Sequence, residues 1–275
     1  MSIHDILGIK KHQIKKLSEI ESLLNRFNSN QVILPLDQRN FDDVLEGGFH
    51  SREKYVVFGA NKTGKTQLCH QLCVQAYIHF HKLFGTKRNK FIYYFDTENT
   101  FRPERIEEIL APTGYNINYV LQNIFISKIM SNSALLLALK NLENNMVKGV
   151  GGLLIIDTIN NYFGFDTSNS NIGFQEARDR FVEILRRVNN LTNEYNLITI
   201  LTSQIVSNFS KNAIIKEIPI GYQFLNHFFS EFVYLSRETI ENIDNNYIQL
   251  INSLSNSEKR VLYKISSKGI HDYRI

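Results

Sequence analysis

The chain has 275 residues, 43% hydrophobic and 21% charged, a composition that suits one sizeable α/β core with a small appendage. Lysine and arginine together number 31 against 27 acidic residues, and the net charge of +4 allows a polyanionic partner without requiring one. No apolar run approaches the roughly 20 residues of a membrane span. The first residues also lack the apolar core of a secretory signal, so we expect a cytoplasmic protein with no membrane partner.

Residues 1–30 come first in chain order and form a polar segment with helical spacing, ending in the linker-like sequence Asn28-Ser29-Asn30. Its lysines cluster at Lys10, Lys11, Lys15 and Lys16. This cluster fits a contact with nucleic acid or a protein partner, and it fits equally a solvated face of a docked helix. We expect a short helical segment and linker at 1–30, followed by one core domain at 31–275.

Residues 55–58 are β-branched and aromatic, which predicts a buried strand, and the next eight residues read G-x-x-x-x-G-K-T. Gly59 and Gly64 allow a tight loop whose N–H groups point inward, and Lys65 adds a cation. Thr66 offers a hydroxyl to a metal ion at the first turn of a helix, whose positive end favours phosphate. The alternative is a chance turn, but the strand before and the helix after favour a phosphate-binding loop. The residues expected to bind a nucleoside triphosphate are Gly59, Ala60, Asn61, Lys62, Thr63, Gly64, Lys65, Thr66 and Gln67.

The chain has two cysteines, Cys69 and Cys73, which lie four residues apart on the helix after this loop, with His70 nearby. A zinc site usually needs four ligands at closer spacing, whereas thiols commonly pack as small hydrophobic groups. We therefore favour core packing for the two cysteines over a metal site.

The later segments alternate between apolar strands and helical patterns. We predict strands at 91–95, 124–127, 153–156 and 197–201, helices from Pro103 and at 133–148 and 174–193, and short antiparallel strands from Phe232 onward. Such alternation is typical of a mostly parallel twisted sheet with helices on both faces. The expected fold class is α/β, with antiparallel strands at the C-terminal end.

Polar side chains follow four of the predicted strands, at the edge of a parallel sheet where ligands gather. The first strand leads into the glycine loop. Asp157 fits a carboxylate that holds Mg²⁺ through water or through Thr66, and Glu98 is placed to deprotonate a water facing the γ-phosphate. Gln204 has the donors and the acceptor to sense that phosphate and to transmit its loss to the following loop. Each residue taken alone also fits a strand-end cap, and for Gln204 the two interpretations are evenly matched.

The segments "GKTQLCHQLCVQA", "DTENTFRPERIEEIL", "LLIIDT" and "LTSQ", in this order and spacing, resemble the archaeal RadA branch of the RecA-type recombinases. The resemblance covers roughly residues 38–237, and "RVLYKISSKGIHDYRI" is similar to the last strands of the family. It implies a RecA-like P-loop core that uses ATP and Mg²⁺. It also implies assembly on single-stranded DNA, a role in homologous recombination and DNA repair, and association with the nucleoid.

The resemblance also implies roles for individual residues. Lys65 and Thr66 would contact the phosphates, Thr66 and Asp157 would hold Mg²⁺, and Glu98 would be the catalytic carboxylate. Gln204 would be the catalytic sensor that leads into the second DNA loop. Arg105 would lie against the adenine, where a planar guanidinium can stack.

Several segments depart from the family pattern. The family's oligomerisation motif, Phe-x-x-Ala, is absent, since Phe27 is followed by Asn30 at that spacing. The first DNA loop has Ile172 in place of an arginine, and the segment that caps a neighbour's ATP reads Ser-Ser-Lys at 266–268 without its proline. The cations expected to bind DNA are Arg178 and, in the short second loop at 205–219, Lys211 and Lys216. Residues 238–258 resemble an insertion.

Intact nucleotide residues together with reduced DNA contacts favour an accessory recombinase paralog, a slow DNA-dependent ATPase that serves the main RadA-type recombinase or other paralogs. Aromatic residues in the loops (Tyr162, Phe163, Phe165, Phe209) could stack on bases, although most would equally suit the core. Two alternatives stay open: a strand-exchange recombinase with a reduced N-terminus, and a nucleotide-switched regulatory ATPase that binds no DNA. A homo-oligomer is compatible with each.

Overall fold

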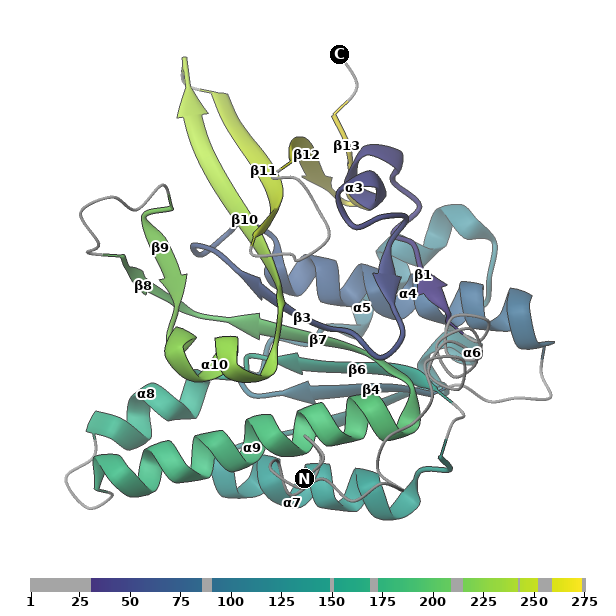
Figure 1. Cartoon of the computed structure of the whole chain (residues 1–275). Coiled ribbons are helices and arrows are strands. Elements are labelled where there is room, and N and C mark those ends of the chain that lie inside the picture. Colours follow the sequence, from purple (N-terminus) through teal and green to yellow (C-terminus); the bar gives the residue numbers. More distant parts are fainter. Residues whose placement is uncertain are drawn as a thin grey trace, which may run out of the picture. The chain divides into compact units, whose positions relative to one another are not determined.

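Nine strands build the central sheet of the protein (Figure 1). The computed structural model describes residues 31–85, 91–148, 151–168, 173–208, 215–241, 243–251 and 259–273. The chain divides into two units between Val32 and Ile33, and the sheet belongs to the second. The N-terminal segment expected at 1–30 lies outside the described residues, so its helix and its lysine cluster stay predictions.

The strands of the sheet follow the order β13-β12-β11-β10-β3-β7-β6-β4-β5. Its parallel strands are β3 (Lys54–Phe58), β4 (Phe91–Asp96), β5 (Ile124–Lys128), β6 (Gly152–Asp157) and β7 (Leu197–Ser203). The later strands are β10 (Glu231–Ile240), β11 (Ile243–Ile251), β12 (Arg260–Ser266) and β13 (Gly269–Asp272). Strand β10 joins β3 in parallel, and β10 to β13 then pair antiparallel. The predicted α/β fold class is confirmed.

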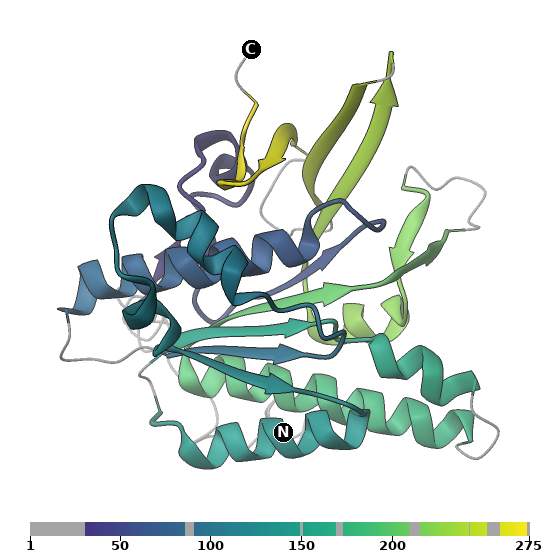
Figure 2. The ribbon, with the colours of Figure 1, turned by 180° about the vertical axis from the view of Figure 1, so that it is seen from behind.

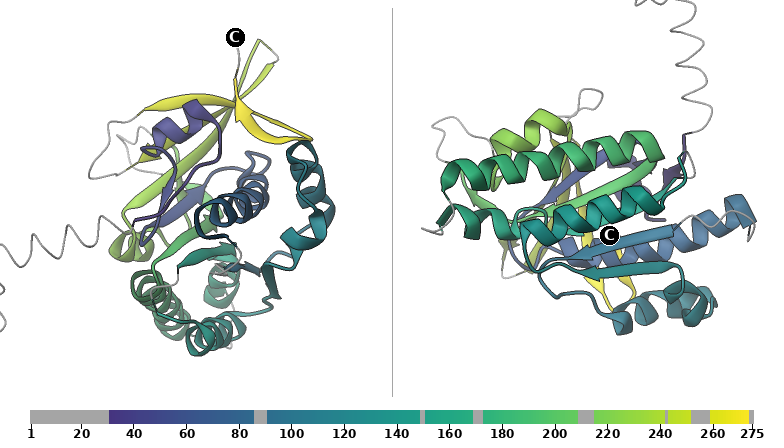
Figure 3. Two further views of the ribbon diagram at one scale, coloured as in Figure 1. Left: turned by 90° about the vertical axis from the view of Figure 1, so that its right-hand side faces the viewer. Right: turned by 90° about the horizontal axis from the view of Figure 1, so that it is seen from below.

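Helices cover both faces of the parallel strands, as the front, back and end-on views show (Figures 1, 2 and 3). One face carries α4 (Lys65–Phe84), α5 (Pro103–Leu110) and α6 (Ile117–Leu121). The other carries α7 (Asn132–Asn145), α8 (Asn161–Ser168), α9 (Phe174–Tyr195) and α10 (Tyr222–Phe228). Every residue of β6 and β7 is buried, which explains their mostly apolar sequences.

Several short elements complete the described chain. They are β1 (Ile33–Leu34), α3 (Arg39–Val44), β2 (Phe49–His50), the 3₁₀ turn η3 (Ala111–Thr113), β8 (Ile205–Ser207) and β9 (Glu217–Pro219). Strands β8 and β9 pair antiparallel and form the neck of the segment that the sequence suggested as the second DNA loop. Among the helices of the described residues, none has both the length and the apolar character needed to cross a membrane.

The helix ends follow local chemistry. Helix α4 starts after Gly64, which adopts a left-handed conformation (φ 99°), and α5 starts with Pro103 at its first position, as predicted. The Ser131 hydroxyl caps α7 by accepting a hydrogen bond from the Ala134 N–H at 3.1 Å. On α9, Glu183 pairs with Arg187 at 2.8 Å, an i,i+4 contact along the helix surface.

The C-terminal strands approach the glycine loop. The Tyr263 hydroxyl on β12 donates to the carbonyl of Thr63, and Ile265 lies against Gly64. The segment expected as an insertion at 238–258 contains the end of β10 and all of β11, a long hairpin paired from Phe232↔Ile251 to Ile240↔Ile243. Residues 252–258 lie outside the described part of the chain.

Candidate functional site

The predicted phosphate-binding loop joins β3 to α4, and its two glycines are sterically required. At Gly59 (φ +151°) a Cβ would overlap the carbonyl oxygen of Leu235 on the neighbouring β10. At Gly64 (φ +99°) a Cβ would lie 2.7 Å from Cδ1 of Ile265. The backbone can therefore take this path only without side chains at these two positions, which leaves a concave cradle at the positive end of α4.

Lys65 lies in this cradle. Its Nζ donates to the carbonyl oxygens of Gly59 at 2.7 Å and Ala60 at 3.0 Å. Burial lowers the pKa of Lys65, while the nearby charges of Asp157 and Glu98 oppose that shift. An ammonium held by loop carbonyls beside inward-facing N–H groups suits a phosphate group, so the residues present fit a triphosphate.

Asp157, at the end of β6, is 1% exposed and accepts hydrogen bonds from several hydroxyls. Its Oδ2 accepts from Thr66 Oγ1 at 2.8 Å and from the Tyr94 hydroxyl at 2.8 Å, and its Oδ1 accepts from Thr202 Oγ1. Because Thr66 donates its hydroxyl hydrogen to Asp157, the lone pairs of that oxygen would stay available to a metal ion. Two hard oxygen ligands with room for water match the coordination habits of Mg²⁺.

Glu98 and Gln204 lie within contact distance although 106 residues separate them in sequence. The Gln204 Nε2 donates to Glu98 Oε1 at 2.7 Å. The turn that carries Glu98 is folded around Asp96, whose carboxylate accepts from the backbone N–H groups of Glu98 (3.2 Å), Thr100 (3.1 Å) and Phe101 (3.0 Å). Sequence reasoning missed this role of Asp96. Its position at the end of a strand, two residues before Glu98 in a D-T-E sequence, was the signal, since aspartate often caps such turns.

These residues surround one pocket with a volume of about 590 Å³. The predicted loop residues that line it are Asn61, Lys62, Gly64, Lys65, Thr66 and Gln67. Glu98, Arg105, Asp157 and Gln204 line it too. A second cavity of about 720 Å³ shares Asn61, Glu98 and Gln204 and also touches Gly59 and Ala60. Thr63 faces inward instead, fully buried, and its hydroxyl donates to Ala60 O at 2.9 Å. The roles of these pocket residues in ATP binding and catalysis stay predictions.

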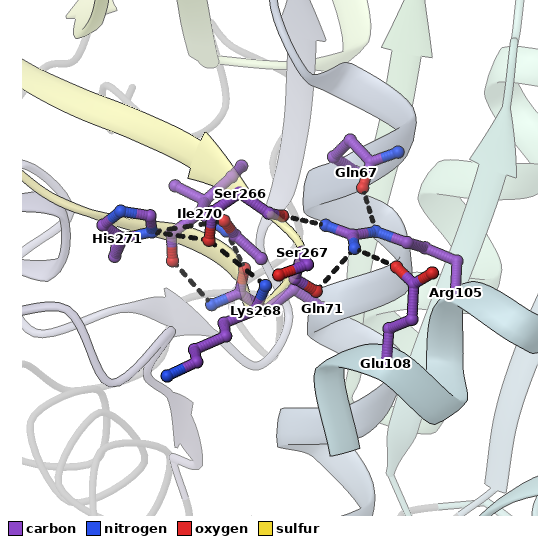
Figure 4. A network of polar contacts seen from close by, with 10 residues as sticks. Gln67, Gln71, Arg105, Glu108, Ser266, Ser267, Lys268, Ile270 and His271 are labelled. Atoms are coloured by element: carbon purple, nitrogen blue, oxygen red, sulfur yellow. Dashed lines mark hydrogen bonds and ion pairs between the residues drawn. The ribbon is translucent and has the colours of Figure 1, made fainter. Parts of the chain in front are cut away.

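Arg105 lines the pocket from α5 and lies beside Gln67 of α4 (Figure 4). Its guanidinium donates to the side chains of Gln67 and Glu108 and to the carbonyl oxygens of Ser266 and Ser267. All four contacts lie along the edge of the guanidinium, so its flat faces are the surfaces on which a base could stack. Ser266, from the segment expected near a neighbour's nucleotide, thus lines the pocket of its own chain.

The two cysteines are fully buried core residues, as the sequence favoured, and burial raises the pKa of each thiol. His70 instead bridges two backbone groups, with Nδ1 2.7 Å from the carbonyl of Thr66 and Nε2 accepting from the Arg102 N–H at 3.0 Å. Burial lowers the pKa of this imidazole. Within the described ranges, three or more His, Cys, Asp or Glu side chains nowhere gather as a metal site would require.

Two of the predicted DNA-binding cations, Arg178 and Lys216, do not line the pocket. Arg178 on α9 pairs with its neighbour Asp179 at 2.8 Å, and Lys216 is exposed beside β9. Lys211 lies outside the described residues.

The structure separates the loop aromatics. Phe163 is 5% exposed in the core, so its stacking on bases is excluded in this fold, whereas Phe165 is 64% exposed. Tyr162 is partly buried and its hydroxyl donates to the Ile129 carbonyl at 2.9 Å. Phe209 belongs to a part of the chain that is not described.

Comparison with known proteins places these features in a family. The Rad51 family model matches residues 28–273. Over 97% of this chain and 85% of the relative, the chain is 28% identical to the meiotic recombination protein DLH1 of Candida albicans. It is 26% identical to the meiotic recombination protein DMC1 of Saccharomyces cerevisiae over 97% and 82%, and 27% identical to the DNA repair protein RAD51 homolog B of Zea mays over 98% and 81%. These relatives support a recombinase family and lend no support to the archaeal RadA branch in particular. The chain belongs to the Rad51 family.

Proposed function

We propose that the chain is an ATP-hydrolysing, single-stranded-DNA-binding recombinase paralog, with residues 31–275 as its ATPase core and 1–30 as an appended segment. The observation that carries the proposal is the 2.7 Å contact between Gln204 and Glu98, formed beside the phosphate cradle at the ends of nearby strands. A carboxylate and a neutral amide in contact at the open edge of a P-loop pocket are suited to activating water and to sensing a phosphate.

In this proposal each residue has one task. The cradle N–H groups and Lys65 bind the phosphates of ATP, and Arg105 stacks against the base. Thr66 and Asp157 would hold Mg²⁺, which when bound supplies positive charge to the phosphate oxygens. Glu98 accepts the proton of a water facing the γ-phosphate. We expect slow ATP turnover, because a complete ATPase site in the RecA-type recombinases commonly needs a neighbouring subunit.

The accessory role is supported by the state of the expected DNA contacts. Arg178 is already paired with the neighbouring Asp179. Of the three cations predicted to bind DNA, the structure describes one more, Lys216. Few phosphate contacts give modest affinity for DNA and a shallow dependence on salt. A protein with an intact nucleotide pocket and weak DNA binding suits a mediator that partners the main recombinase. Kinship with the RadA branch, association with the nucleoid and a homo-oligomer remain parts of this proposal.

The ATPase assignment is tested with three variants. Glu98→Gln should keep ATP binding and lose turnover, because the amide cannot accept a proton. Lys65→Ala should lose ATP affinity, because the phosphate charge is left uncompensated. Glu107→Gln is the matched control, an exposed carboxylate on α5 outside the pocket, and should hydrolyse ATP as the natural chain does. Unchanged hydrolysis by the Glu98 variant would refute the assignment.

The DNA assignment is tested by fluorescence anisotropy with a labelled single-stranded oligonucleotide over a salt series. Binding that weakens with salt supports the proposal and excludes the regulatory ATPase without DNA contact. D-loop formation by the purified protein alone would favour the strand-exchange recombinase instead.

A further inference from the structure

Gln204 is held by two consecutive asparagines at the end of β6 and the start of α8. Asn160 is fully buried and binds the backbone of Gln204, since its Oδ1 accepts from the Gln204 N–H at 3.0 Å and its Nδ2 donates to the Gln204 carbonyl at 3.1 Å. Asn161 binds the side chain, with Oδ1 3.4 Å from Gln204 Nε2. One residue thus fixes the position of Gln204, and the next orients its amide.

Asn161 also reaches the segment that carries the proposed catalytic carboxylate. Its Nδ2 donates to the carbonyl of Thr97 at 2.7 Å, one residue before Glu98. The two hydrogens of Gln204 Nε2 are therefore shared between Glu98 Oε1 at 2.7 Å and Asn161 Oδ1 at 3.4 Å. Asn161 consequently contacts the side chain of Gln204 and the Thr97 carbonyl, whose peptide bond leads into Glu98.

Asn160 extends this arrangement to the segment 205–219. Its Nδ2 also donates to the carbonyl of Ile220 at 3.0 Å, and the Ile220 N–H donates to the Gln204 carbonyl at 2.9 Å. The neck of the segment continues as the pairing of Ile205 with Pro219. The residues that flank the segment, Gln204 and Ile220, are therefore both hydrogen-bonded to the buried side-chain amide of Asn160, which lies three residues after Asp157.

We infer that Asn161 is a positioning residue that orients the amide of Gln204, and through Gln204 couples ATP turnover to the segment 205–219. This inference rests on the proposed ATPase function. A γ-phosphate oxygen is an acceptor that competes for the hydrogens which Glu98 and Asn161 now share. When the Gln204 amide turns toward the phosphate, its contact with Asn161 changes, while the hydrogen bonds of Asn160 link Gln204 to the Ile220 end of the neck. Asn161 sets the orientation from which Gln204 starts.

The test is the steady-state ATP hydrolysis of Asn161→Ala, with and without a single-stranded oligonucleotide. We expect kcat with DNA to fall about tenfold, since misorientation of a group near the reacting atoms commonly costs that much or more. KM should stay within about twofold, because Asn161 lines the adjoining cavity beside Glu98 and Gln204 and not the pocket lined by Lys65 and Thr66. The ratio of the rates with and without DNA should fall toward 1. A purely structural role would leave that ratio unchanged.

The variant should fold, because Asn161 is only partly buried and the Thr97 carbonyl keeps a contact with the Tyr162 hydroxyl at 3.3 Å. If the alanine variant does not fold, Asn161→Ser is measured in the same hydrolysis assay in its place. Asn145→Ala is the matched control, an exposed asparagine on α7 whose amide contacts only its own helix, and it should retain the natural rates and ratio.

A double-mutant cycle separates the inference from the general function. If Asn161 acts through Gln204, then Asn161→Ala should lower kcat no further in a Gln204→Ala background. Additive losses would overturn the inference, as would a raised KM with unchanged kcat. If the natural chain hydrolyses ATP and the Asn161 variant hydrolyses it at the same rate, this inference is overturned and the proposed function stands. A natural chain that hydrolyses no ATP overturns the proposed function as well.

Discussion

Gln71 links the P-loop helix to the C-terminal strands, and its removal should destabilise the whole core. It lies on α4 with 3% of its surface exposed. Its Oε1 accepts from the Ile270 N–H at 2.6 Å, and its Nε2 donates to the Ile270 carbonyl at 3.0 Å. The Gln71 amide thereby pairs with β13 as the backbone of a further strand would (Figure 4). It lies so close to β13 that a Cβ at Gly269 would be 2.5 Å from Gln71 Oε1.

Gln71→Ala leaves one buried N–H and one buried carbonyl of Ile270 without this partner. Each unsatisfied buried group costs about 1–3 kcal/mol, so with partial access of water the free energy of unfolding should fall by about 3 kcal/mol. The variant should also bind ATP more weakly, because β12 and β13 support Gly64 and border the pocket.

Urea unfolding followed by circular dichroism measures the effect, since the chain has no tryptophan to report by fluorescence. Gln175→Ala, an exposed glutamine on α9, is the control and should stay within about 0.5 kcal/mol of the natural chain. A loss below about 1 kcal/mol for the Gln71 variant would show that the amide bridge contributes little.

Three further predictions follow from the same contacts. Burial raises the pKa of Asp42 from 3.8 to about 6, so the folded state binds more protons than the unfolded state between these values. The free energy of unfolding should therefore fall as pH rises from about 4 to 6, by about 1–2 kcal/mol after solvent screening, and Asp42→Asn should flatten that slope in urea titrations. Asp157→Asn should raise the Mg²⁺ concentration needed for half-maximal hydrolysis by about tenfold, because one carboxylate charge near the metal is lost; an unchanged requirement would place the metal elsewhere. Gly64→Ala should weaken ATP binding, since alanine is strained at φ +99° and its Cβ would also displace the end of the Ile265 side chain; a variant that binds ATP normally in equilibrium dialysis would contradict the cradle geometry.

The sequence was sufficient for features that depend on local pattern. Continuous burial of β6 and β7 gives apolar runs, and the glycine loop lies between a strand and a helix as such loops require. The expectation that polar strand ends meet at one edge follows from parallel strands alone, and Glu98, Asp157 and Gln204 do line one pocket.

Features that depend on distant pairing were not predictable in the same way. The role of Gln71 depends on a partner 199 residues later in the chain, and no local pattern marks it. Asn160 and Asn161 read as ordinary turn residues until β7 and the end of segment 205–219 lie beside them. Phe163 resembled a loop aromatic because the helix that carries it, α8, is short and has little amphipathic pattern of its own. The rings that pack against it, Phe181 and Phe224, lie on the later helices α9 and α10.

The docking of β12 on the glycine loop has a consequence for how the protein is made. Thr63 and Tyr263 are 200 positions apart, so the ribosome must add all the intervening residues before their hydrogen bond can form. At roughly 5–20 residues per second, that interval is on the order of 10–40 s, during which the emerging N-terminal half carries a glycine loop without its supporting strands. Nucleotide capture by nascent chains should therefore begin abruptly, once the hairpin of β12 and β13 has left the exit tunnel.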